Sequence, residues 1–194
     1  MKKYSFLALL FVLNCSVLLA QKTSKIIVDH SDFADINENE LPGATLLTGN
    51  VRVNHDGVIM TCNKAYYFKN ENYIKAFGNV QMVQGDTLYL NSNYAEYNGN
   101  VKQAYATGKV VMRSPESNMV TDTINFDRVK QEAYYNSGAT ITNRDNTLKS
   151  KSGRYYLQQK KYQFLTAVVL TNPQYTIKSN HLDYKPIKII IVFH

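Results

Sequence analysis

The run best suited to acid–base or nucleophilic chemistry is Asp29-His30-Ser31-Asp32, near the start of the chain. Serine, histidine and aspartate are the parts of a hydrolase triad, in which the histidine removes the proton of the serine hydroxyl. Adjacent residues of an extended strand point to opposite faces, so these four side chains cannot converge on one reacting atom. We therefore expect no catalysis at this run.

Other spacings also argue against an enzyme. The histidines His30, His55, His181 and His194 lie far apart, and no Cys-x-x-Cys pair, paired carboxylates or glycine-rich phosphate loop stands out. A β-solenoid enzyme acting on polysaccharide would need carboxylates clustered on adjacent rungs, and none are in register. The sequence therefore predicts a protein without catalytic residues, metal site or cofactor.

Residues 1–20 have the organisation of a secretory signal peptide, with two lysines before an apolar run that ends at Ala20. The run is shorter than a membrane-spanning helix requires. Cleavage after Ala20 would leave residues 21–194, enough for a substantial core. The sequence thus predicts an exported protein.

The two cysteines bear on processing and redox state. Val12-Leu13-Asn14-Cys15 resembles a lipoprotein cleavage box, and in this alternative Cys15 would carry lipid. After cleavage at Ala20, Cys62 would be the remaining thiol and could form no internal disulfide. We expect Cys62 to act as a small buried hydrophobic side chain.

The charge of the chain is mildly basic. The formal net charge is +7, and removal of Lys2 and Lys3 with the leader lowers it to +5. Such an excess fits an anionic partner, either phosphorylated lipid or nucleic acid. The basic residues are scattered, and an exported protein rarely meets nucleic acid, so we expect no nucleic-acid binding.

A repeat of about 30 residues organises the rest of the chain. Frames begin at Gly49, Gly78, Gly108 and Gly138, and a degenerate fifth frame begins at Ala167. A second signature, in which a polar residue is followed two and four positions later by a small or apolar residue and an aromatic one, recurs in phase. It occupies residues 63–67, 93–97, 122–126, 152–156 and 180–184.

Turn-forming residues recur about every 15 positions, and β-branched and aromatic residues alternate between them, which predicts two strands of roughly ten residues per frame. A glycine inside alternate strands indicates a bend or bulge. The apolar residues occupy even positions at Val58, Met60 and Cys62 and odd positions at Ala65 and Tyr67. A bulge produces such a switch of parity. The third frame keeps its parity through Val120, Asp122, Ile124 and Phe126. The expected fold is all-β: an antiparallel meander folded along its length into a V-shaped trough with free first and last strands.

The repeat motifs resemble those of the OstA/LptA family of OstA-like domains, in the form found in the Bacteroidetes. The resemblance extends from Ile26 to Tyr184 and implies a β-jellyroll, or β-taco, for a domain of residues 21–185. The segments that carry it are Leu47-Thr48-Gly49-Asn50-Val51, Ala76-Phe77-Gly78-Asn79-Val80, Gln84-Gly85-Asp86-Thr87-Leu88 and residues 121–127.

This resemblance also implies a function and partners. It implies a periplasmic protein, associated with outer-membrane assembly, that binds the lipid A part of lipopolysaccharide by its acyl chains. It further implies edge-to-edge assembly with an LptC-like and an LptD-like transport component, and end to end with further copies of the chain. Residues 186–194 form an apolar tail unlike a further repeat, and a truncated or a frame-shifted chain would explain such a tail.

Apolar parity assigns the side chains expected to line the trough, small near the fold line and large away from it. The predicted lipid-binding residues are Val51, Val53, Met60, Ile74, Ala76, Val80, Met82, Leu88, Leu90, Ala106, Val110 and Met112. The alternative is an ordinary closed sandwich core, as in a β-repeat scaffold or adhesin that needs no lipid. Co-purifying lipid would separate the two.

Overall fold

The computed structural model describes residues 24–36, 41–86, 88–115, 117–185 and 188–190, which form one antiparallel sheet of fifteen strands. The predicted signal peptide lies outside these residues. Within them, no helix is long and apolar enough to cross a membrane. The strands are β1 (Ile27–His30), β2 (Phe33–Ile36), β3 (Thr45–His55), β4 (Val58–Phe68), β5 (Tyr73–Gln84), β6 (Leu88–Asn98), β7 (Gln103–Arg113), β8 (Asn118–Asp127), β9 (Glu132–Tyr135), β10 (Ala139–Asn143), β11 (Asn146–Ser150), β12 (Ser152–Tyr156), β13 (Lys161–Asn172), β14 (Tyr175–Lys185) and β15 (Lys188–Ile190).

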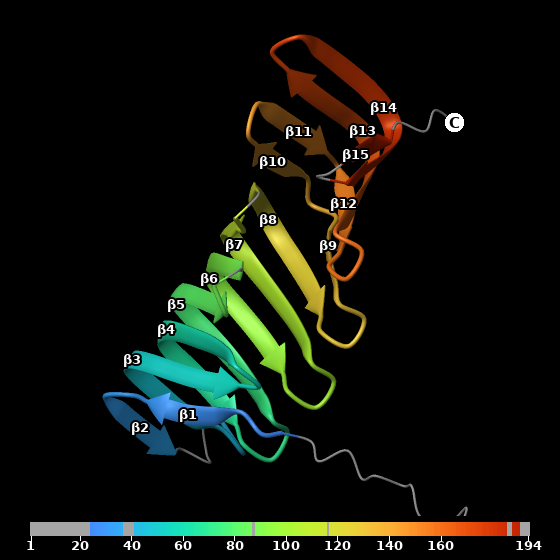
Figure 1. The fold of residues 1–194 in the computed structure, drawn as a ribbon. Coiled ribbons are helices and arrows are strands. Elements are labelled where there is room, and N and C mark those ends of the chain that lie inside the picture. Colours follow the sequence, from blue (N-terminus) through green and yellow to red (C-terminus); the bar gives the residue numbers. More distant parts are fainter. Residues whose placement is uncertain (1–23, 37–40, 87, 116, 186–187, 191–194) are drawn as a thin grey trace, which may run out of the picture.

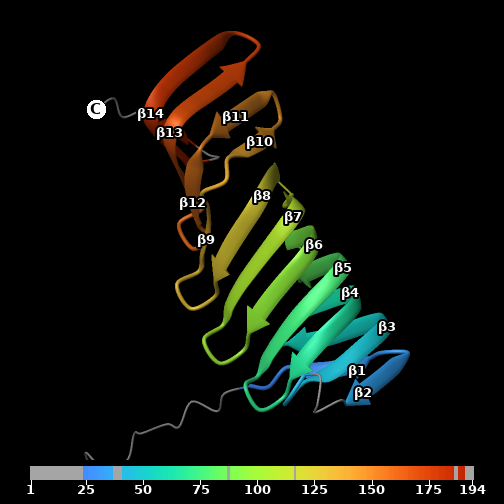
Figure 2. The same ribbon diagram turned by 180° about the vertical axis from the view of Figure 1, so that it is seen from behind.

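From β3 to β8 the sheet is a simple meander, because each strand pairs with the next along the chain. These six strands have 10 to 12 residues, close to the predicted length. Figures 1 and 2 show them side by side along the long axis of the molecule, from β1 and β2 at one end to β13 and β14 at the other. The prediction of an all-β antiparallel meander is confirmed.

Alternate long strands, β3, β5, β7 and β13, each carry a bulge near the midpoint. On β5 and β6, Phe77 pairs with Tyr94 and Val80 pairs with Ser92, so β5 holds one residue more than β6 between the same two rungs. Gly78 begins this extra turn with a φ of 72°, in the left-handed region that glycine enters without strain. The same bulge recurs at Gly49 in β3 and at Gly108 in β7, and the whole sheet bends along the line of these bulges.

The bulge corrects two predictions about the repeat. In β8, Met119 is buried and Val120 is 47% exposed, yet Ile124 is buried, so the third frame switches parity like the others. Extrapolating alternation across the bend was wrong because the inward series of β8 changes from odd to even positions between Thr121 and Ile124. Ala139 and Val168 are buried like Val80, which is the third residue of its frame. The last two frames therefore begin at Ser137 and Thr166, one residue earlier than predicted.

The fourth frame breaks at the bend. Strand β8 pairs with both β9 and β10, and β13 pairs with both β11 and β12. The short strands β9 and β10 therefore together take the place of one bent strand, and β11 and β12 take the place of the next. The tail continues the sheet, because β15 pairs with β14; residues 186–187 and 191–194 lie outside the described residues.

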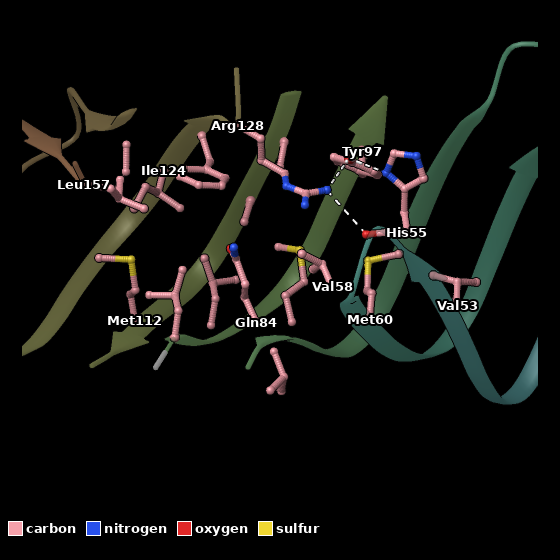
Figure 3. A pocket seen from close by; sticks show the side chains of 18 of the residues that line it. Val53, His55, Val58, Met60, Gln84, Tyr97, Met112, Ile124, Arg128 and Leu157 are labelled. Atoms are coloured by element: carbon pink, nitrogen blue, oxygen red, sulfur yellow. Dashed lines mark hydrogen bonds between the residues drawn. The ribbon is translucent and has the colours of Figure 1, made fainter. Parts of the chain in front are cut away.

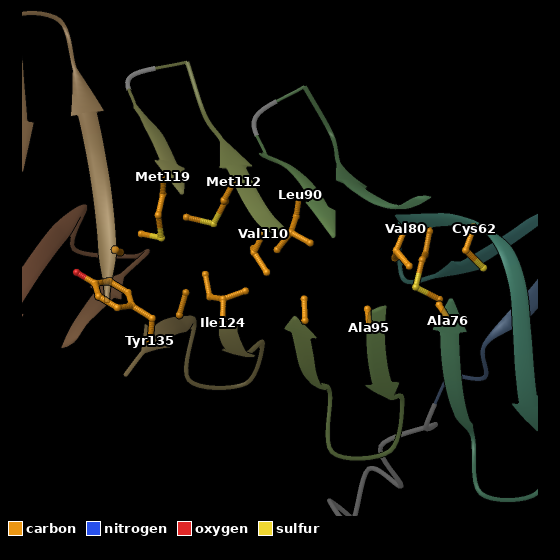
Figure 4. Close-up of a cluster of buried hydrophobic side chains, with 14 of the residues drawn as sticks. Cys62, Ala76, Val80, Leu90, Ala95, Val110, Met112, Met119, Ile124 and Tyr135 are labelled. Carbon is orange, nitrogen blue, oxygen red and sulfur yellow. The ribbon is translucent and has the colours of Figure 1, made fainter. Parts of the chain in front are cut away.

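The bends divide the sheet into two arms that face each other. The first arm ends in hairpin turns near Asp56, Gly85, Ser114, Arg144 and Pro173, and the second arm ends in turns near Asn70, Asn100, Val129 and Gln159. In Figure 4, Leu90, Met112 and Met119 of the first arm point toward Ala95, Ile124 and Tyr135 of the second. The predicted V-shaped cross-section is therefore present, with the core between the arms.

Candidate functional site

An elongated apolar pocket lies between the two arms, on the N-terminal side of the molecule. It opens to solvent on one side, and its exposed wall is almost entirely carbon. The wall combines side chains of β3 to β8 with others from β9 and β12. Such an arrangement can hold a long hydrocarbon, and it offers few polar groups for a hydrophilic ligand.

The structure divides the predicted lining residues into two layers. Seven of the twelve line the pocket itself, and they are Val53, Met60, Met82, Leu88, Leu90, Ala106 and Met112. The other five are fully buried: Val51, Ala76, Val80 and Val110 lie near the bends and form the floor beneath the pocket, and Ile74 lies near the tip of the second arm. Parity alone could not separate wall from floor, because both layers point the same way.

Several lining residues were missed by the sequence analysis. The apolar ones include Val58, Ala104 and Phe126, which lie on the inward face of strands already assigned to the trough. Parity could have found Ala104, which alternates in step with the predicted residues Ala106, Val110 and Met112. Phe126 was assigned to the wrong parity series together with Val120.

The polar residues at the mouth of the pocket come from three separate segments. His55 ends β3 on the first arm, Tyr97 precedes a turn of the second arm, and Arg128 lies in the next turn of that arm. The Nδ1 atom of His55 is 2.7 Å from the hydroxyl oxygen of Tyr97, and Nη1 of Arg128 donates to the same oxygen at 3.1 Å. Figure 3 shows these three side chains joined across the pocket.

Arg128 also bonds the backbone of the first arm. It donates to the carbonyl oxygen of His55 at 3.4 Å and to that of Asp56 at 3.3 Å. Lys102, from the second arm, forms an ion pair with Asp56 at 3.0 Å. We name this cluster of His55, Asp56, Tyr97, Lys102 and Arg128 the latch, because its bonds join the two arms at their tips.

The chain segment before β1 completes the latch. The Oγ atom of Ser24 lies 2.8 Å from Nε2 of His55. Hydrogen bonds from the side chains of Ser24 and Lys102 lower the pKa of Asp56 from 3.8 to about 2. The bonds form a consistent chain from Arg128 through Tyr97, His55 and Ser24 to Asp56 when a neutral His55 carries its proton on Nε2.

The same segment closes one end of the pocket. Ile26 is buried and contributes to the pocket wall. Its N–H donates to the side-chain oxygen of Asn72 at 2.8 Å, and its carbonyl accepts from the hydroxyl of Tyr67 at 2.8 Å. Since Ser24 bonds the first arm and Ile26 the second, this segment bridges both arms at the N-terminal end.

In the part of the chain that the structure describes, the remaining reactive residues form no catalytic arrangement. Nε2 of His30 lies 3.1 Å from Asp32 at an exposed edge, far from the pocket wall. Cys62 is buried, as expected, and burial raises the pKa of its thiol. Among the described residues, no group of three His, Cys, Asp or Glu side chains could hold a metal ion. The absence of enzymatic activity stays a prediction.

The chain matches a family model and is similar to solved structures. The model of the family described as "OstA-like protein" matches residues 23–180. One similar solved structure is the crystal structure of LptH, the LptA homologous periplasmic component of the lipopolysaccharide transport device of Pseudomonas aeruginosa. It is 14% identical, with a TM-score of 0.34, and the match covers 75% of this chain and 93% of that one. No curated protein matches the chain.

Proposed function

The chain belongs to the OstA-like protein family, and from that premise we propose that it binds lipopolysaccharide through the acyl chains of lipid A and helps carry it across the periplasm. The observation that carries this proposal is the elongated apolar pocket between the arms. Each methylene group removed from water contributes about 0.8 kcal/mol, so acyl chains are the ligand class that such a wall favours most.

The pocket wall suits chains of varied length. Met60, Met82 and Met112 project into it, and methionine is unbranched and flexible enough to adapt to an irregular apolar partner. A closed core would pack these side chains against one another. Here Met60 and Met112 are buried, but Met82 and Leu88 are only partly buried, which leaves part of their surface to a ligand.

The partners in this proposal pair with the free edges of the sheet. Strand β2 is exposed along its whole length, and Phe33 and Ile36 there are 74% and 67% exposed. Unpaired edges of this kind offer backbone groups to another strand. We propose that an LptC-like and an LptD-like component, or further copies of the chain, pair with the edges at the two ends.

A photo-crosslinking experiment tests the lipid site. A photoreactive phenylalanine analogue is placed at Met112, on the pocket wall, or at its neighbour Val111, on the opposite face of β7. The full chain is expressed in a Gram-negative periplasm and irradiated. We expect lipopolysaccharide adducts at position 112 and few or none at position 111.

Equal labelling at both positions would contradict an internal lipid site. Mass spectrometry of co-purified lipid is the second test, with Met82→Asp as the pocket variant. Substitution of Val80 is unsuitable for this purpose because it belongs to the fully buried floor. A folded protein without lipid in both experiments would instead favour a β-repeat scaffold or adhesin.

A further inference from the structure

Arg128 differs from the other charged residues of the latch because its charge is uncompensated. Its three bonds go to neutral oxygens, the Tyr97 hydroxyl and the carbonyls of His55 and Asp56. Within the described part of the chain, no carboxylate forms an ion pair with it, whereas Arg52 and Arg154 each have one. Arginine side chains this close to an apolar wall are normally paired or bind an anion.

The nearby carboxylate does not fill that role. Asp56 is engaged by Lys102 at 3.0 Å and by the side chain of Ser24. The Arg128 guanidinium reaches only the backbone oxygen of Asp56. The mouth of the pocket therefore carries two cations, Lys102 and Arg128, against one carboxylate, Asp56.

We propose that Arg128 is the anchor for the anionic headgroup of an amphiphile whose hydrocarbon chains fill the pocket. This inference rests on the proposed function and names the headgroup chemistry, a phosphate group or its close analogue. The planar guanidinium can form two parallel bonds to a phosphate, which replace its bonds to the two carbonyls. Binding would thereby loosen the backbone link between Arg128 and the tip of the first arm.

The test compares amphiphiles with equal chains and different heads. Dodecyl phosphate and dodecyl maltoside are titrated calorimetrically, below their micelle concentrations, into the purified chain and into Arg128→Gln. We expect Arg128→Gln to weaken dodecyl phosphate binding by about tenfold or more, the value of a charge-assisted bond pair, while dodecyl maltoside binding changes less than about twofold. Arg128→Lys should recover part of the loss.

Arg113→Gln is the matched control, since Arg113 is exposed on β7 and does not line the pocket. An equal loss in this control would overturn the anchor in favour of a general charge effect. An equal loss of both amphiphiles in Arg128→Gln would overturn it in favour of a purely structural role. Inorganic phosphate is titrated alone, and tight binding of it would show a free anion site instead.

Different outcomes of this experiment refute the proposed lipid site and the Arg128 anchor. If the wild-type chain binds neither amphiphile, the proposed lipid site itself is refuted. If it binds both and Arg128→Gln binds both equally well, the pocket stands and only the anchor is refuted. Circular dichroism of each variant establishes that the fold is retained before either conclusion is drawn.

Discussion

Gly49 and Asp32 face each other at the first bend of the sheet. The N–H of Asp32 donates to the carbonyl oxygen of Gly49 at 2.9 Å, and a Cβ atom added at Gly49 would lie 2.9 Å from Cβ of Asp32. The pattern recurs at the next bends, where Gly78 faces Asn63 and Gly108 faces Asn93. The glycine of one strand thus packs against the polar residue at the bend of the preceding strand, which explains why both recur in phase.

The first prediction concerns the glycine at this bend. We expect Gly49→Ala to lower the free energy of unfolding, because alanine would take a left-handed φ of 75° and would also collide with Asp32. The comparison is Gly57→Ala, whose φ is 78° but whose Cβ would meet nothing within 4 Å. Chemical denaturation should show Gly49→Ala to be about 1–3 kcal/mol more destabilising than Gly57→Ala.

A second substitution isolates the collision. Asp32→Gly removes the side chain that the new Cβ atom would meet, so it should recover part of the stability of Gly49→Ala. Equal costs for Gly49→Ala and Gly57→Ala would contradict the packing explanation and leave backbone strain as the whole effect.

Much of the fold could be predicted because the residues that form turns and bends recur in each repeat. Turn residues mark the strand ends, and Gly49, Gly78 and Gly108 mark the bends. The predicted position of a bend was wrong where residues other than glycine form it. Thr166 and Ala167 adopt φ values of 63° and 51° without a glycine, so the last bend was placed one residue late.

Less of the site could be predicted, for a geometric reason. The apolar wall follows from alternation within each strand, which is local information. The latch does not, since His55 is 42 positions from Tyr97 and 73 from Arg128. In the sequence His55 stands out only as one of four widely spaced histidines, and nothing in one sequence links the three segments that the bends bring together.

The second prediction concerns Tyr97, whose hydroxyl joins both arms. Tyr97→Phe removes the bonds to His55 and Arg128 while keeping the ring. We expect a loss of about 1 kcal/mol in the free energy of unfolding. Hydrogen exchange should also accelerate in the turns around Asp56 and Asn100. Tyr89→Phe, at an exposed ring, is the control, and similar changes in both variants would argue against the latch.

The third prediction concerns acid. A carboxyl group whose pKa is lowered by folding stabilises the fold above its ordinary pKa and loses this effect as pH falls toward the folded value. For Asp56 that window runs from near 3.8 down to about 2. The difference in free energy of unfolding between the wild type and Asp56→Asn should therefore shrink as the pH falls through this range. A difference that stays constant with pH would refute the contribution of the Asp56 charge.

Carbon-13 NMR of the Asp56 carboxyl group gives an independent measurement of its pKa. Since the side-chain bonds of Ser24 and Lys102 hold this pKa low, Ser24→Ala and Lys102→Gln should each raise it toward 3.8. Lys149→Gln removes a positive charge from an exposed position on β11, away from the latch, and serves as the control. A pKa that moves equally in the control would indicate long-range charge alone.

The fourth prediction separates a binding pocket from an unfilled core. Ala104 is half-buried and lines the pocket, so Ala104→Phe would occupy part of the space reserved for acyl chains. We expect the variant to retain or increase its thermal stability, because the ring buries apolar surface, while the amount of co-purified lipid falls at least severalfold. Val111→Phe, on the outer face of the same strand, should change neither. A variant that keeps its stability and loses its lipid would show that the space at Ala104 holds the ligand, whereas a space that serves only packing could be filled without loss of lipid. Unchanged lipid in Ala104→Phe would place the lipid elsewhere on the molecule.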